Sequence, residues 1–169
     1  YGWPCISSHF GLMDTCGFPK DTYYYYRSWW STNRVLHLLP HWNWPGREGE
    51  EIDVRCFSNC EEVELFLNGQ SLSRQTMKKN SHLTWKVKYA PGTLLARGYR
   101  RGREILSSKV ETTGASTAIR LASHRTAIRA NARDISVITV QAIDAQGRPV
   151  PTANNEISFE LNGRSEERR

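Results

Sequence analysis

Two tryptophans in the segment HWNW have a spacing that suggests a binding surface. Trp42 and Trp44 stand two residues apart within residues 35–44, which read as a strand, so both side chains should point to one face. Two indoles on one face can form a platform on which a sugar ring stacks. The same pair would equally serve as a packing seam against the aromatic segment just upstream, and we favour the seam.

Arginines are densest in RGYRRGR, residues 97–103. A basic stretch of this kind can bind phosphate, but it also reads as the solvated end of a hairpin, which we favour. The formal net charge of +6 is spread along the chain, and no segment is dominated by one sign. Because a nucleic-acid binder usually concentrates positive charge on one patch, we expect no nucleic-acid partner.

The cysteines Cys5, Cys16, Cys56 and Cys60 lack the spacing of a zinc site, because no second pair matches the lone Cys-x3-Cys. We expect free buried thiols, with a disulfide as the alternative. We also find no Gly-rich phosphate loop and no Ser/His/Asp arrangement above chance. The sequence therefore predicts neither a metal nor a cofactor.

A helix with aromatic residues around most of its circumference should follow the first loop. Pro19, Lys20 and Asp21 read as its first turn, because proline lacks an N–H that the turn would leave unpaired and Asp21 favours the helix dipole. The following aromatics cover well over half of a helical wheel: Tyr23, Tyr24, Tyr25, Tyr26, Trp29 and Trp30. Such a helix should be buried on several sides, so residues 1–33 need a neighbour.

Residues 34–112 read as short strands with turns at Asn68–Gly69, Pro91–Gly92 and Arg101–Gly102. Six or seven antiparallel strands over this length predict an immunoglobulin-like β-sandwich. The expected strands are 35–44, 51–58, 62–69, 70–77, 83–90, 93–100 and 104–112.

Residues 113–169 begin with a Gly-Ala-Ser linker, and strand patterns follow at 118–124, 135–144 and 155–161. Three or four strands cannot close a sandwich, so this segment should be the first half of a second one, with an exposed inner face. No apolar stretch approaches the ~20 residues that cross a membrane, and no membrane partner is expected. We interpret the chain as an internal piece of a larger multidomain protein.

The blocks FGLMDTCGFPKDTYYYY and HLLPHWNWPG make the chain resemble the β-galactosidase-like enzymes of glycoside hydrolase family 2. The resemblance runs through residues 1–112 and continues beyond them. It implies a mainly β chain in which residues 1–33 are the last loop and helix of a truncated (β/α)8 catalytic barrel. Residues 34–112 would then be an immunoglobulin-like β-sandwich, and residues 113–169 an incomplete second immunoglobulin-like domain.

The resemblance also implies retaining hydrolysis of terminal β-glycosides by two glutamates, one acting as general acid/base and one as nucleophile. Both would lie on earlier barrel strands, so no catalytic residue is expected in this chain, and the missing upstream barrel becomes an expected partner. The glutamates that are present should lie on solvated strand faces and turns: Glu48, Glu50, Glu51, Glu61, Glu62 and Glu64.

By the same resemblance, the loop before Gly11 would lie at the face of the barrel that carries the active site. Ser7, Ser8, His9 and Phe10 would then bind the sugar or merely pack the loop, and Trp3 would form a rim or cover the barrel top. Asp14 should bond to the loop backbone.

Since the Asn-x-Lys pattern of uronide-cleaving relatives is absent, a neutral galactoside is the expected substrate. The alternative function is a stand-alone carbohydrate-binding β-sandwich that uses Trp42 and Trp44.

Overall fold

The structure is a computed structural model that describes residues 10–14, 16–129, 131 and 133–160. The chain divides into two compact units, Tyr1–Thr112 and Thr113–Arg169. Each unit has its own antiparallel strands, and each is described separately below.

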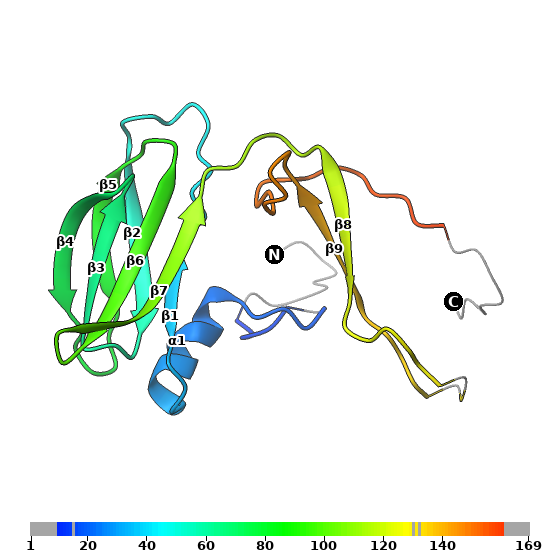
Figure 1. The fold of residues 1–169 in the computed structure, drawn as a ribbon, viewed down its shortest axis with the longest axis horizontal. Helices are drawn as coiled ribbons and strands as arrows, with labels where there is room; N and C mark the ends of the chain where they lie inside the picture. The colour runs from blue at the N-terminus through cyan, green and yellow to red at the C-terminus, as the bar shows by residue number, and fades with distance from the viewer. Residues whose placement is uncertain (1–9, 15, 130, 132, 161–169) are drawn as a thin grey trace. The chain divides into compact units, whose positions relative to one another are not determined.

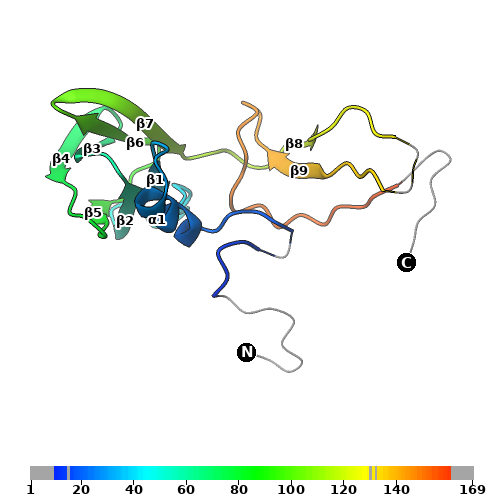
Figure 2. The same cartoon turned by 90° about the horizontal axis from the view of Figure 1, so that it is seen from below.

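The first unit is a sandwich of two antiparallel sheets (Figure 1). One sheet has the order β1-β2-β5, formed by Leu36–Leu39, Glu51–Ser58 and Leu83–Lys88. The other has the order β4-β3-β6-β7, formed by Gln70–Thr76, Glu62–Leu67, Thr93–Arg100 and Arg103–Glu111. Figure 2 shows the sheets as separate layers. This arrangement confirms the predicted immunoglobulin-like β-sandwich.

The core of the sandwich follows from the alternation of its strands. In β2 the residues Ile52, Val54 and Cys56 point inward, while the intervening residues are exposed. Leu65 of β3 and Leu94 of β6 face them and have no exposed surface. Because successive side chains of a strand point to opposite faces, each sheet contributes one apolar face to the core.

Two of the predicted turns close tight hairpins. Asn68–Gly69 and Arg101–Gly102 both have positive φ at each residue, 49° and 84° in the first pair and 49° and 74° in the second. These angles match the turn type whose twist suits two antiparallel strands, and they favour glycine at the second position. The hairpins β3–β4 and β6–β7 were therefore predictable from short sequence signals.

The strand predicted at 35–44 is shorter than expected. β1 ends at Leu39, and the Leu39–Pro40 peptide bond is cis. Pro40 has no N–H to donate to a ladder, which stops the strand there. Trp42, Asn43 and Trp44 consequently lie in the loop between β1 and β2.

The aromatic helix α1 runs over Asp21–Trp30, with Lys20 as its N-cap. The predicted first turn was wrong for Pro19, which instead forms an isolated bridge with Met13. Lys20 is extended, and its N–H donates to the Leu12 carbonyl at 2.9 Å, so the helix cannot begin before Asp21. Asp21 does place its negative charge in the first turn, as expected.

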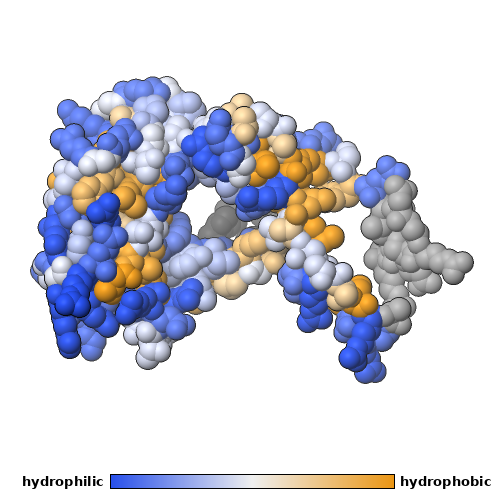
Figure 3. Space-filling model, viewed as in Figure 1, coloured by the Kyte–Doolittle hydropathy of each residue, from blue (hydrophilic) through white to orange (hydrophobic). Residues whose placement is uncertain are grey.

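The second unit contains the hairpin β8–β9, formed by Ala118–Ser123 and Ile138–Ile143. Every residue of β8 is exposed, and Figure 3 shows hydrophobic side chains at the surface over both strands. The strand predicted at 155–161 was wrong for residues 155–160, which form no ladder with any described part of the chain. An apolar pattern alone cannot make a strand without a neighbour to bond.

Candidate functional site

Most of the loop predicted to contact the sugar lies outside the described residues. This applies to Trp3, Ser7, Ser8 and His9. Phe10 is described, and 87% of its surface is exposed. Its ring is therefore accessible, while the sugar-binding role of all these residues stays a prediction.

Asp14 organises the loop that follows. Its Oδ1 accepts the backbone N–H groups of Cys16 at 2.9 Å and Phe18 at 2.8 Å. Its own N–H donates to the Phe18 carbonyl at 2.9 Å. A side chain that bonds the backbone two and four residues ahead closes a turn locally, which confirms the predicted role of Asp14.

The inner face of α1 is fastened to the sandwich by aromatic and polar contacts. The Tyr25 hydroxyl donates to the Asn80 carbonyl at 2.8 Å, and the Trp29 indole N–H donates to the Ser81 carbonyl at 3.2 Å. The Tyr25 ring meets Phe57 of β2 edge-on, with centroids 5.5 Å apart. The seam between helix and sheet is thus built by residues other than the predicted tryptophan pair.

Asp21 and His37 form a second link between α1 and β1. His37 Nε2 lies 2.7 Å from Asp21 Oδ1, and the His37 ring stacks on Tyr24 with centroids 3.9 Å apart. The hydrogen bond to His37 lowers the pKa of the Asp21 carboxyl, while partial burial opposes that shift. This pair was not predicted from the sequence. The alternation around Leu38 places His37 on the outer face of the strand, but it does not indicate which residue of the helix lies opposite.

The opposite face of α1 remains open. Tyr26 and Trp30 pack against each other with centroids 4.7 Å apart, and Trp30 is 79% exposed. Together with neighbouring side chains they line a shallow hollow: Leu12, Tyr23, Arg27, Ser31 and Asn33. Tyr26 and Trp30 are therefore exposed, as expected of a helix whose second neighbour lies outside this chain, whereas the other aromatics of the helix are half-buried: Tyr23, Tyr24, Tyr25 and Trp29.

The tryptophans of HWNW have roles that differ from both expectations. Trp42 has no exposed surface, donates its indole N–H to the Ala90 carbonyl at 2.9 Å and packs edge-on against Tyr89. Trp44 is half-buried, stacks on His41 at 4.6 Å and has the Arg47 guanidinium over its ring. Because Trp42 is fully buried, it cannot be a sugar platform, and its ring packs in the core of the sandwich against Tyr89.

The glutamates of the sandwich pair with basic or hydroxyl groups on its outer faces. Arg74 donates to Glu62 at 2.6 Å and Lys86 to Glu51 at 2.8 Å. Glu64 accepts hydrogen bonds from Ser71 at 2.6 Å and Tyr99 at 3.1 Å. Burial and the bond to Glu64 raise the pKa of Tyr99. These contacts fit the predicted placement of the glutamates on solvated strand faces.

The cysteines of the described residues are free thiols. Cys56 and Cys60 are buried as predicted, and burial raises the pKa of the Cys56 thiol. The prediction was wrong for Cys16, which is exposed, and Cys5 lies outside the described residues.

Within the described part of the chain, no group of His, Cys, Asp and Glu side chains could hold a metal. No helix there has both the length and the apolar character to span a membrane.

Both units match known protein families. Residues 49–106 match a domain of unknown function, DUF4982, and residues 119–167 match glycoside hydrolase family 2 C-terminal domain 5. The first match covers most of the sandwich, and the second covers most of the unit that contains β8 and β9. The chain therefore joins two modules that are each found in other proteins.

Similar proteins resemble this chain along nearly its whole length. The beta-galactosidase BoGH2A of Bacteroides ovatus is 42% identical over 96% of this chain and 19% of its own length. A putative beta-glucuronidase of Formosa agariphila is 32% identical over 90% of this chain and 15% of its own. A beta-glycosidase structure from Bacteroides vulgatus has a TM-score of 0.90 at 37% identity, over 95% of this chain and 21% of that one. The chain thus spans about a fifth of these relatives.

Proposed function

Since the chain belongs to glycoside hydrolase family 2, we propose that it is an accessory region of a retaining β-glycosidase that hydrolyses terminal β-galactosides. The observation that carries this proposal is the similarity to the beta-galactosidase of Bacteroides ovatus, which is 42% identical over 96% of the chain. A match that crosses both units and the linker supports a shared arrangement of modules rather than one common domain.

The preference for a neutral sugar rests on two observations. The chain is 42% identical to the beta-galactosidase and 32% identical to the putative beta-glucuronidase. The sequence also lacks the Asn-x-Lys pattern that we expect where a uronic acid carboxylate is held. Galactosides are therefore the proposed substrates, and glucuronides are the competing ones.

An accessory role for these residues follows from how their glutamates are used. A retaining pair of carboxyl groups lies roughly 5 Å apart and must reach the substrate. Glu51, Glu62 and Glu64 are instead engaged with Lys86, Arg74, Ser71 and Tyr99 on the outer faces of the sandwich. We propose that the catalytic pair belongs to a barrel that precedes this region in the parent enzyme.

We further propose that the outer face of α1 packs against that barrel. Trp30 is 79% exposed, and the hollow lined by Tyr26 and Leu12 is apolar enough to receive side chains from a neighbour. In this arrangement the sandwich holds one face of the helix and the barrel covers the other. The segment whose residues Trp3, Ser8, His9 and Phe10 are proposed to contact the sugar would then belong to the barrel face that carries the active site.

The test is hydrolysis by the parent enzyme, expressed from the complete coding region. We expect a chromogenic β-galactoside to be cleaved with a higher kcat/KM than the matching β-glucuronide. The isolated 169-residue chain should cleave neither. A preference for the glucuronide would contradict the substrate proposal, and cleavage by the chain alone would contradict its accessory role.

A matched pair of variants tests the loop. Phe10→Ala in the parent enzyme should lower kcat/KM by roughly tenfold, about 1.4 kcal/mol, if its ring packs on the sugar. Phe18→Ala is the control, because Phe18 is also exposed, at 47%, but lies beyond the turn closed by Asp14. Equal losses in both variants would show that the loop only supports the fold.

A further inference from the structure

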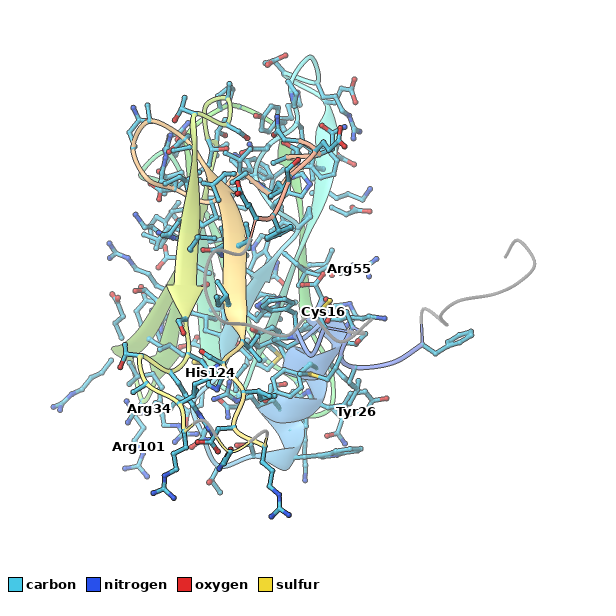
Figure 4. The ribbon with its side chains drawn as sticks, turned by 90° about the vertical axis from the view of Figure 1, so that its right-hand side faces the viewer. Cys16, Tyr26, Arg34, Arg55, Arg101 and His124 are labelled. Atoms are coloured by element: carbon cyan, nitrogen blue, oxygen red, sulfur yellow. The ribbon has the colours of Figure 1, made fainter. Side chains whose placement is uncertain are left out.

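The tip of the β6–β7 hairpin holds several arginines in a fixed arrangement. Arg100 pairs with Arg103 across the hairpin, and Arg101 and Gly102 form the turn. The Arg101 N–H donates to Glu61 Oε2 at 2.7 Å, which ties the turn to the start of β3. Figure 4 labels Arg101 at this end of the sandwich. The backbone that carries these side chains is therefore held from two sides.

The arginines of the tip differ from the other arginines on the same sheet. Arg74 is paired with Glu62, and Arg97 lies 3.6 Å from Glu104. The side chains of Arg100, Arg101 and Arg103 have no ion pair with any described residue, and all three are exposed. Together with Ile105 they line one hollow in the surface.

Several guanidinium groups around one hollow present planar N–H donors that match the oxygens of a carboxylate or sulfate. Ile105 adds an apolar patch on which the C–H face of a sugar ring can rest. From this arrangement we propose that the hollow binds the sulfate or carboxylate groups of an anionic polysaccharide. The proposal concerns the sandwich alone and does not depend on the proposed glycosidase activity.

The surroundings of the hollow favour a polysaccharide over a nucleic acid. Single-stranded nucleic acids bind where bases can stack on open aromatic rings. Here the nearby rings are covered, since the Arg74 guanidinium lies 3.8 Å from the centroid of Tyr99 and that of Arg97 lies 5.0 Å from Phe66. A polysaccharide needs no open ring for base stacking, because its sulfate or carboxylate groups meet the guanidinium groups directly.

The experiment compares binding of dextran sulfate and uncharged dextran to the 169-residue chain by titration calorimetry. Dextran sulfate should bind and dextran should not. The triple variant Arg100→Gln/Arg101→Gln/Arg103→Gln should weaken binding by at least about tenfold and reduce the salt dependence, because fewer counterions are exchanged. The control is the triple variant Arg125→Gln/Arg129→Gln/Arg133→Gln, which removes the same charge from exposed arginines of the second unit. This control should weaken binding of dextran sulfate by less than about twofold.

Three outcomes would overturn the proposal. One is equal weakening by the two triple variants, since binding would then follow net charge rather than this hollow. Another is binding of a single-stranded oligonucleotide as tightly as dextran sulfate, and the third is a failure of dextran sulfate to bind at low salt. The far-UV circular dichroism spectrum of each triple variant must match that of the unsubstituted chain. If the spectrum of the hairpin variant differs, the single variant Arg103→Gln takes its place, and its affinity for dextran sulfate should fall roughly threefold.

Discussion

The sandwich of residues 34–112 and the hairpin β8–β9 come from similar strand patterns but differ in what they bury. In the sandwich, the leucine at position 65 has no exposed surface, whereas Leu121 of β8 is 65% exposed. Both residues lie in antiparallel ladders without a register shift, Leu65 in the pairing of β3 with β6 and Leu121 in that of β8 with β9. The ladder therefore follows from the local pattern, and the core requires a second sheet opposite the first.

An apolar strand face thus contributes stability only when another layer covers it. Burying a leucine side chain is worth about 1.5–3 kcal/mol relative to leaving it in water. The sandwich obtains this contribution at many positions at once: Val54, Val63, Leu65, Leu94 and Trp42 are all fully buried. The apolar residues of β8 remain in contact with solvent within the described part of the chain.

The largest expected effect comes from the same substitution made in the two regions. Leu65→Ala should lower the free energy of unfolding of the sandwich by about 2–5 kcal/mol, since it removes buried contacts and leaves a cavity. Leu121→Ala should change stability by less than about 0.5 kcal/mol, because Leu121 is already exposed. Urea unfolding followed by circular dichroism measures both. Similar losses would mean that β8 has a covering layer in solution.

Glycine substitutions in the two units should also differ in their effect on stability. A Cβ at Gly98 of β6 would overlap Cys60 Sγ, so Gly98→Ala should cost about 1–3 kcal/mol. A Cβ at Gly114 would lie 3.9 Å from Asp144 Cβ, an ordinary contact, so Gly114→Ala should cost less than about 0.5 kcal/mol.

The double variant Gly98→Ala/Cys60→Ala tests the cause of the first loss. It should be more stable than the sum of the single variants predicts, because the smaller side chain relieves the overlap. Additive losses in urea unfolding would refute the overlap as the cause.

A smaller effect is expected where α1 meets the sandwich. Tyr25→Phe removes the hydroxyl that donates to the Asn80 carbonyl and should cost about 0.5–1.5 kcal/mol. Tyr26→Phe is the matched control on the open face of the same helix and should be nearly neutral. Thermal unfolding monitored by tyrosine fluorescence compares them. A larger loss from Tyr26→Phe would show that the open face is also packed in the isolated chain.

The last comparison concerns pH and is confined to the second unit. The hydrogen bond from Arg148, with backbone N–H groups including that of Gly114, lowers the pKa of Asp144 to about 2. Because this pKa is below its ordinary value of 3.8, the ionised carboxylate stabilises the fold at higher pH. That stabilisation should be lost as the pH falls from about 4 through 2.

The Gly114 amide resonance, followed by NMR, reports this titration. Asp144→Asn should abolish the acid-dependent shift, whereas Asp134→Asn should leave it in place. Persistence of the shift in Asp144→Asn would assign it to another group.

Much of the ladder structure could be predicted, because its signals lie within a few residues of one another. The strands at 51–58 and 93–100 have the predicted bounds, and two predicted turns have the backbone angles that glycine allows. The start of the helix was misplaced because Pro19 pairs with Met13, a contact that no helical signal contains. The strand predicted at 155–161 failed over residues 155–160 because it found no partner.

The candidate site was less predictable than the fold. The role of Asp14 could be inferred, because an aspartate in a tight loop bonds to nearby backbone. The contact between Asp21 and His37 joins residues from different elements, and only the docking of the helix brings them to 2.7 Å. The sugar-contacting role of Ser8, His9 and Trp3 stays a prediction.

By itself, the sequence determined where the strands and turns lie and which residues could do chemistry, because backbone preference and side-chain alternation act over short distances. The tertiary structure alone decided which faces are covered. It placed Trp42 in the core and left Trp30 open, and it kept the side chains of Arg100, Arg101 and Arg103 without an ion pair among the described residues. The physical reason is that burial and ion pairing depend on what lies opposite a side chain, and that neighbour is usually distant in the sequence.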